Sequence, residues 1–191
     1  MAVETSQQEK ILDAAYHCIA KQGYAHVTLR QIAKEAGVAV SQISYHYQNK
    51  EGLLLAVVTR AANKYQEYLQ DYLKPDMTPK EKGDTLIRLY QQLLEEDVEL
   101  FRVLYDLVGL SLWSEPFRLE VKEVFEGITE QITTEVFTDE LMGELGYVYS
   151  SKTLASVFFG GLFGIAIQAL LEQENEDIIK SLSALVVIFN K

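Results

Sequence analysis

Cysteine, proline and tryptophan are scarce in this chain of 191 residues, which contains one, three and one of them, respectively. A single cysteine excludes an intramolecular disulfide and is typical of a reducing compartment, so we expect a cytoplasmic protein in which Cys18 is a buried thiol. The prolines Pro75, Pro79 and Pro116 all fit helix breaks, and no Asn-Gly or Asp-Gly hairpin turn occurs. These absences disfavour a disulfide scaffold and an all-β fold.

Signatures of catalysis and of metal binding are also missing. No G-x-S-x-G motif, P-loop or glycine-rich dinucleotide fingerprint occurs. His17, His26 and His46 are the only histidines, and none is followed by a second ligand three or four residues on, which disfavours a zinc site. We therefore predict that the protein is not an enzyme and that it uses no metal or cofactor.

Basic residues are too few to balance the acidic ones, and the net charge is −11. Residues 1–52 contain five basic and five acidic residues, so the rest of the chain carries the whole negative charge. An acidic surface repels nucleic acid, and any phosphate-binding surface should therefore lie in this neutral N-terminal segment. Its non-specific affinity for DNA should be modest and sensitive to salt.

The segment from residue 27 to residue 53 is the most informative part of the sequence. Thr28 with Gln31 predicts a capping box at the start of a short helix, and Gly37 predicts the left-handed end of that helix. A second short helix would bury Tyr47 together with either Val40 or Ile43. A long helix would then start near residue 50. The pattern predicts two helices joined by a tight turn.

The exposed face of the second short helix would carry small polar and aromatic side chains, which is typical of a helix-turn-helix motif that reads DNA. We predict that Gln42 reads a base, because an amide can form two hydrogen bonds with adenine. Other side chains would enter the major groove or position the motif on phosphates. The predicted DNA-binding residues are Thr28, Arg30, Ser41, Gln42, Ser44, Tyr45, His46 and Lys50.

At these residues the chain resembles the TetR family of bacterial transcriptional regulators. The segment GVAVSQISYHYQNKEGLL is similar to that family's recognition helix and the entry to its fourth helix, and ILDAAYHCIAKQGYAHVTLRQIAKEAG is similar to its first two helices. The resemblance covers roughly the first 55 residues. It implies a dimeric, ligand-responsive DNA-binding protein, most often a repressor. The chain departs from the family at Ala39, where serine is common, and loss of that cap costs about 1 kcal/mol.

The remaining sequence predicts an all-α fold of about nine helices. We expect a three-helix DNA-binding domain in residues 1–50 and a helical effector-binding and dimerisation domain in residues 51–191, joined through the fourth helix. The expected helices outside the motif cover about 7–22, 50–73, 79–95, 97–113, 117–137, 150–171 and 177–189, with a short helix or loop at 139–146.

The run from Thr153 to Leu171 has no charged residue and is long enough to span a membrane. Ser156 and Gln168 interrupt it, its C-terminal flank is acidic, and a second amphipathic helix follows, so we predict a subunit interface and no membrane partner. The resemblance implies that the last two long helices pair with their copies in a homodimer. The predicted interface residues are Gly160, Gly161, Gly164, Leu182 and Leu185.

Six aromatic residues of the middle helices form the predicted ligand-binding set: Tyr90, Phe101, Tyr105, Trp113, Phe117 and Phe125. Each one alone is more simply explained as core, but the family resemblance favours a pocket for a small, largely apolar effector. The alternative is a dimeric DNA-binding protein that has no effector. The expected partners are double-stranded DNA with a pseudo-palindromic operator, a second copy of the chain and this effector.

Overall fold

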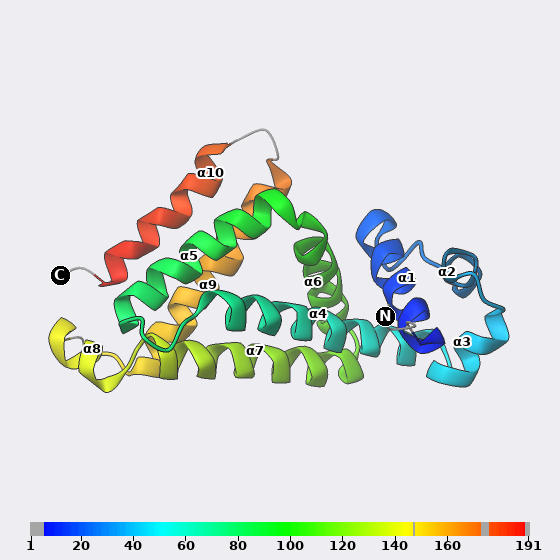
Figure 1. Cartoon of the computed structure of the whole chain (residues 1–191), viewed down its shortest axis with the longest axis horizontal. Helices are drawn as coiled ribbons and strands as arrows, with labels where there is room; N and C mark the ends of the chain where they lie inside the picture. Colours follow the sequence, from blue (N-terminus) through cyan, green and yellow to red (C-terminus); the bar gives the residue numbers. More distant parts are fainter. Residues whose placement is uncertain (1–5, 147, 173–175, 190–191) are drawn as a thin grey trace. The chain divides into compact units, whose positions relative to one another are not determined.

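The computed structural model describes residues 6–146, 148–172 and 176–189, and these residues form ten α-helices and one 3₁₀-helix without any strand (Figure 1). The all-α prediction is confirmed, with ten α-helices where about nine were expected. The helices are α1 (Gln7–Gln22), α2 (Leu29–Ala36), α3 (Val40–Tyr47), α4 (Lys50–Tyr72), α5 (Pro79–Glu96), α6 (Val98–Ser111), α7 (Glu115–Glu135), α8 (Asp139–Leu145), α9 (Ser151–Leu171), α10 (Glu176–Ser181) and the 3₁₀-helix η1 (Leu182–Phe189).

The chain packs as two compact units. Unit 1 consists of Met1–Lys64 and Arg102–Val121, and unit 2 consists of Tyr65–Phe101 and Lys122–Lys191. Helices α4, α6 and α7 therefore contribute to both units. Unit 1 holds the helix-turn-helix motif together with residues 50–64 of α4 and parts of α6 and α7.

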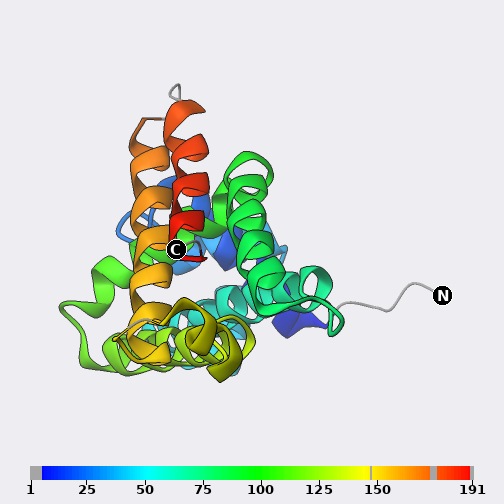
Figure 2. The ribbon, with the colours of Figure 1, turned by 90° about the vertical axis from the view of Figure 1, so that its left-hand side faces the viewer.

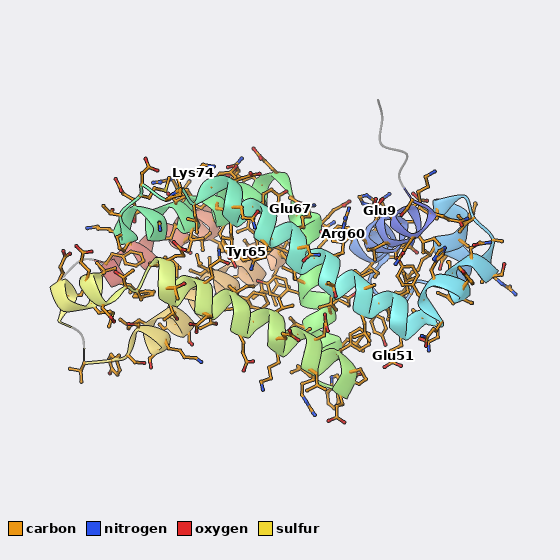
Figure 3. All side chains as sticks on the ribbon, turned by 60° about the horizontal axis from the view of Figure 1, so that its bottom comes forward. Glu9, Glu51, Arg60, Tyr65, Glu67 and Lys74 are labelled. Atoms are coloured by element: carbon orange, nitrogen blue, oxygen red, sulfur yellow. The ribbon has the colours of Figure 1, made fainter. Side chains whose placement is uncertain are left out.

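Unit 1 forms its helices largely as the sequence predicts. The capping box of Thr28 and Gln31 starts α2, and Gly37 ends that helix in the left-handed region with a φ of 68°. Cys18 is buried as expected, and burial raises the pKa of its thiol. Arg60 on α4, labelled in Figure 3, donates to the carboxylate of Asp13 on α1 at 2.8 Å. This ion pair joins the long helix to the first one.

Unit 2 is built around α5, α9, α10 and η1. Figure 2 shows α9 and the α10–η1 segment side by side, and α5 packs against both α9 and η1. The rings of Phe137, Phe158 and Phe189 lie with their centroids 5.3–6.0 Å apart and form an aromatic core. A Cβ atom on Gly83 would lie only 2.5 Å from the ring of Phe189, so glycine permits this close approach of α5 and η1.

The last helix differs from the expectation of a single α-helix over residues 177–189. The α-helical part ends at Ser181 and the chain continues as η1, with 3₁₀ geometry. Residues three apart lie on the same face of a 3₁₀-helix. Leu182, Leu185 and Ile188 follow that spacing, and all three are at least partly buried. Leu182 and Phe189, the two buried residues of η1, lie seven positions apart and so do not share that spacing with each other.

Candidate DNA-binding and dimer surfaces

Helix α3 is fixed in the helix-turn-helix motif by two buried side chains. Ile43 is fully buried while Val40 is 38% exposed, which decides between the two candidates for the core position. Tyr47 is also buried, and its hydroxyl donates to the carbonyl oxygen of Gln8 at 2.9 Å. Helices α1, α2 and α3 pack against one another (Figure 1). One face of α3 is therefore held in the motif, and the other is available.

The available face of α3 carries the predicted recognition residues. Ser41 and Ser44 are exposed, and Tyr45 is 81% exposed. Gln42 is half-buried, and the half-buried ring of His46 packs edge-on against Tyr45 with centroids 5.1 Å apart. The five side chains share one short helix that projects polar and aromatic groups. This geometry suits insertion into a major groove, and the individual base contacts stay predictions.

The three remaining predicted DNA-binding residues are in different situations. Arg30 is exposed on α2. The hydroxyl of Thr28 is engaged in the capping box, where it accepts from the backbone of Gln31 at 3.3 Å. The ammonium of Lys50 donates to the carbonyl oxygen of Tyr24 at 3.0 Å and lies 5.1 Å from the centroid of the Tyr24 ring. A phosphate contact by Lys50 would have to compete with these interactions.

A tight turn that no sequence pattern indicates joins α3 to α4. Gln48 has a φ of 67° and a ψ of −55°, and the backbone N–H of Asn49 donates to the carbonyl of Tyr47 at 2.7 Å. These values describe a γ-turn, which is strained for a residue other than glycine. The side chain of Asn49 accepts from the backbone of Gly52 at 2.9 Å and thereby caps α4. The recognition helix is thus followed at once by a rigid corner.

The distribution of charge separates the two units. By sequence, unit 1 contains nine basic and eight acidic residues, whereas unit 2 contains eight basic and twenty acidic ones. The near-neutral unit is the one that holds the helix-turn-helix motif. Electrostatics therefore leaves unit 1 as the surface on which DNA can be bound.

Comparison with known proteins agrees with this geometry. Residues 11–57, which span α1 to the first half of α4, match the family model described as "Bacterial regulatory proteins, tetR family". The chain is also 30% identical over 129 residues to the fatty acid metabolism regulator protein of Bacillus subtilis (strain 168), an alignment that covers 66% of each chain. The chain belongs to the TetR family. Proteins of this family are transcriptional regulators and not enzymes.

Solved structures of TetR-family proteins share the fold over nearly the whole chain. A TetR-family transcriptional regulator from Rhodococcus sp. superposes with a TM-score of 0.86 at 18% identity, covering 97% of this chain and 100% of the other. The transcriptional regulator FadR from Bacillus subtilis, solved in complex with stearoyl-CoA, gives a TM-score of 0.80 at 23% identity, covering 94% and 96%. At these identities the likeness establishes the fold alone.

The predicted dimer residues fall into two groups. Leu182 is fully buried within one protomer, and a Cβ atom on Gly161 would lie 2.8 Å from Leu185 of the same chain. Gly161 and Leu185 therefore lie where α9 packs against η1 inside the protomer, and both keep part of their surface exposed. Gly160 and Gly164 have no atom within 4 Å of an added Cβ, so they lie open.

An exposed apolar stripe runs along α9 through the two open glycines. Val157, Ile167 and Leu171 are large apolar residues that remain exposed, by 58%, 39% and 78%. Together with Gly160 and Gly164 they follow a spacing of three and four residues, which is the pattern of a helix–helix seam. Of the described helices, α9 alone is long and apolar enough to cross a membrane by length and composition, but its opposite face is buried in unit 2.

The six predicted ligand-binding aromatics are divided between the two units. Three of them belong to unit 2, where Tyr90 contacts Phe101 at 5.7 Å between centroids and Phe125 contacts two rings of α9. The others, Tyr105, Trp113 and Phe117, belong to unit 1. Trp113 is 90% exposed, which does not fit an enclosed pocket. The sequence placed all six on neighbouring helices but could not show that α6 and α7 are divided between two units.

Unit 2 also contains hollows that no sequence pattern indicates. One of about 360 Å³ lies among α4, α5, α7 and the connection between α4 and α5. Leu69 and Leu73 provide apolar lining, and Lys74 and Lys82 provide cationic groups. Lys82 forms an ion pair with Glu135, which also lines the hollow. Its volume lies at the lower end of the range for small-molecule sites.

Proposed function

We propose that this TetR-family regulator binds a pseudo-palindromic operator as a homodimer and represses transcription until an effector releases it. The observation that carries the proposal is the exposed face of α3, where Ser41, Gln42, Ser44 and Tyr45 project from a helix that buried side chains hold in place. Two such helices in a symmetric dimer would reach major grooves about 34–36 Å apart. A cytoplasmic location follows from this role.

The homodimer is supported by the stripe on α9. Val157, Ile167 and Leu171 expose apolar surface that a lone protomer would leave in water. Gly160 and Gly164 leave room for the backbone of a second helix to approach. Pairing of α9 with its copy would bury this surface. We therefore propose the stripe as the centre of the dimer interface.

We further propose that the effector is a largely apolar molecule that carries an anionic group and binds in unit 2. The hollow lined by Leu69, Leu73, Lys74 and Lys82 combines apolar and cationic groups in a unit that is otherwise strongly acidic. The printed name of the relative from Bacillus subtilis refers to fatty acid metabolism, and FadR was solved with stearoyl-CoA. Long-chain fatty acids and their CoA thioesters are therefore the first probes to use.

The proposal is tested by selecting duplex oligonucleotides that bind the purified protein. We expect a two-fold symmetric consensus with half-sites one helical turn apart. Selection of asymmetric or single-stranded sites would contradict the DNA-binding mode. Titration of the selected duplex complex with oleate, oleoyl-CoA and free CoA then tests release. If none of these changes DNA affinity or thermal stability, the proposed effector class is wrong and a DNA-binding protein without an effector is favoured.

A further inference from the structure

The turn that follows α1 is held by two residues from distant parts of unit 1. The backbone N–H of Tyr24 donates to the carboxylate of Asp106 on α6. The carbonyl oxygen of the same residue accepts from the ammonium of Lys50 at the start of α4, at 3.0 Å. The Lys50 ammonium also lies 5.1 Å from the centroid of the Tyr24 ring. Both polar groups of the Tyr24 backbone are thus bound by charged side chains, and such hydrogen bonds are stronger than neutral ones.

The local sequence makes room for this arrangement. Gly23 ends α1 with a φ of 76°, a value that L side chains rarely adopt, and a Cβ atom there would lie 3.6 Å from the Asp106 carboxylate. The turn leads within a few residues to Thr28, which caps α2. The direction in which the chain enters the helix-turn-helix motif therefore depends on α6 as well as on α1. Asp106 lies in sequence far from the motif but packs in the same unit.

We propose that Asp106 and Lys50 are positioning residues for operator recognition. They fix the turn at Tyr24 and hence hold the α1–α3 bundle in one orientation, without either residue having to touch DNA. The inference rests on the proposed DNA-binding function. It replaces the phosphate contact predicted for Lys50 with an internal role, because the structure already gives its ammonium an acceptor and an aromatic ring.

The direction in which DNA affinity changes when Asp106 is replaced distinguishes a positioning role from a general effect of its negative charge. Asp106 carries negative charge in the DNA-binding unit, so its removal should strengthen DNA binding if charge alone matters. If Asp106 positions the turn, its removal should weaken binding. Asparagine retains an oxygen that can accept from Tyr24, and Asp106→Asn should therefore behave differently from Asp106→Ala. The two explanations predict opposite results for the same substitution.

The experiment compares the wild-type dimer with Asp106→Ala, Asp106→Asn and the control Glu115→Ala. Glu115 is an exposed carboxylate of the same unit that pairs with Arg118, so its removal matches the change in charge. Affinity for the selected operator duplex is measured by fluorescence anisotropy over a range of salt concentrations. Amide hydrogen exchange at Tyr24 reports the hydrogen bond directly.

We expect Asp106→Ala to weaken operator binding by about tenfold or more, equivalent to about 1.4 kcal/mol, and to speed exchange at the Tyr24 amide. Asp106→Asn should restore affinity to within about threefold of wild type, and Glu115→Ala should not weaken binding. Lys50→Met should lower affinity and leave the salt dependence unchanged, whereas loss of a phosphate contact would reduce the slope by about 0.9.

Several outcomes would overturn the inference. Unchanged or tighter binding by Asp106→Ala would show that the carboxylate does not position the motif. Equal weakening by the alanine and asparagine variants would show that the acceptor oxygen is not what matters. If the alanine variant folds poorly, a folded asparagine variant that binds more than about threefold more weakly than wild type would show the same. Failure of the wild type to bind any duplex would instead contradict the proposed function. Unchanged exchange at Tyr24 in both variants would independently rule out the hydrogen bond.

Discussion

The carbonyl oxygen of Tyr47 lies only 2.3 Å from the position that a Cβ atom on Gly52 would occupy. Tyr47 is the last residue of α3 and Gly52 lies in the first turn of α4. The end of the recognition helix and the start of the long helix therefore approach each other closely where α4 has a glycine. The carbonyl oxygen is part of the backbone, and a Cβ atom is bonded directly to it. An added methyl group therefore cannot be accommodated by rotating a flexible side chain.

Substitution of Gly52 by alanine should destabilise unit 1 by about 1–3 kcal/mol, because overpacking forces the backbone to shift. Gly109 on α6 is the matched control, since a Cβ atom there meets nothing within 4 Å. Gly109→Ala should be neutral or stabilising by up to about 1 kcal/mol, because alanine is the better helix former. Urea unfolding followed by circular dichroism measures both. Equal stability of Gly52→Ala and wild type would contradict the close approach.

At the N-terminus of α3 a substitution should stabilise the protein. Ala39 occupies the N-cap position and makes no side-chain hydrogen bond there. Ala39→Ser should add a side-chain acceptor for the backbone N–H groups in the first turn of α3 and stabilise the protein by about 1 kcal/mol. Ala39→Val, which supplies no acceptor, is the control and should not gain stability. Thermal and urea unfolding that gave the serine and valine variants the same stability would count against an uncapped helix.

Base reading by Gln42 and phosphate binding by Arg30 should be separable in binding experiments. Gln42→Ala should cost about 1–3 kcal/mol at one base pair and relax specificity there. Arg30→Ala should weaken all sequences alike and reduce the salt dependence by about one unit of slope. Anisotropy with the operator and single-base variants measures both effects. If Gln42→Ala weakened every duplex equally, the base-reading role would be wrong.

Local signals in the sequence predicted much of this molecule. The capping box at Thr28, the left-handed Gly37 and the apolar periodicity placed the motif correctly, because each acts through neighbouring residues. The γ-turn at Gln48 was missed, since glutamine is not a residue that predicts a positive φ. The hydrogen bond between the Tyr24 backbone and Asp106 was missed because it joins residues 82 positions apart. Its one signal was the single carboxylate of the otherwise apolar stretch from residue 103 to residue 110.

The interior of unit 2 should lose stability at alkaline pH. Burial raises the pKa of Tyr65 to about 12, whereas an unfolded tyrosine titrates near 10. The folded state thus retains its proton over a range in which the unfolded state releases it. The stabilisation is complete below about pH 10 and declines as pH rises towards 12. The free energy of unfolding, measured with urea between pH 8 and 11, should decline less for Tyr65→Phe than for wild type. An equal decline in the two proteins would contradict the raised pKa of Tyr65.

The two open glycines of α9 give the sharpest test of the homodimer. An added Cβ atom at Gly160 or Gly164 meets no atom of the protomer within 4 Å, and leucine at both positions would fill the space in which a second helix is expected to approach. The double variant should therefore remain folded, become monomeric and lose operator affinity, because one DNA-binding unit makes only half of the contacts. Gly127→Leu on α7 is the control, since that glycine is also exposed and open. Gly161→Leu should instead destabilise the protomer, because its side chain would meet Leu185. Sedimentation of the wild type as a monomer at micromolar concentration, or full operator binding by a monomeric double variant, would show that this stripe does not hold the dimer.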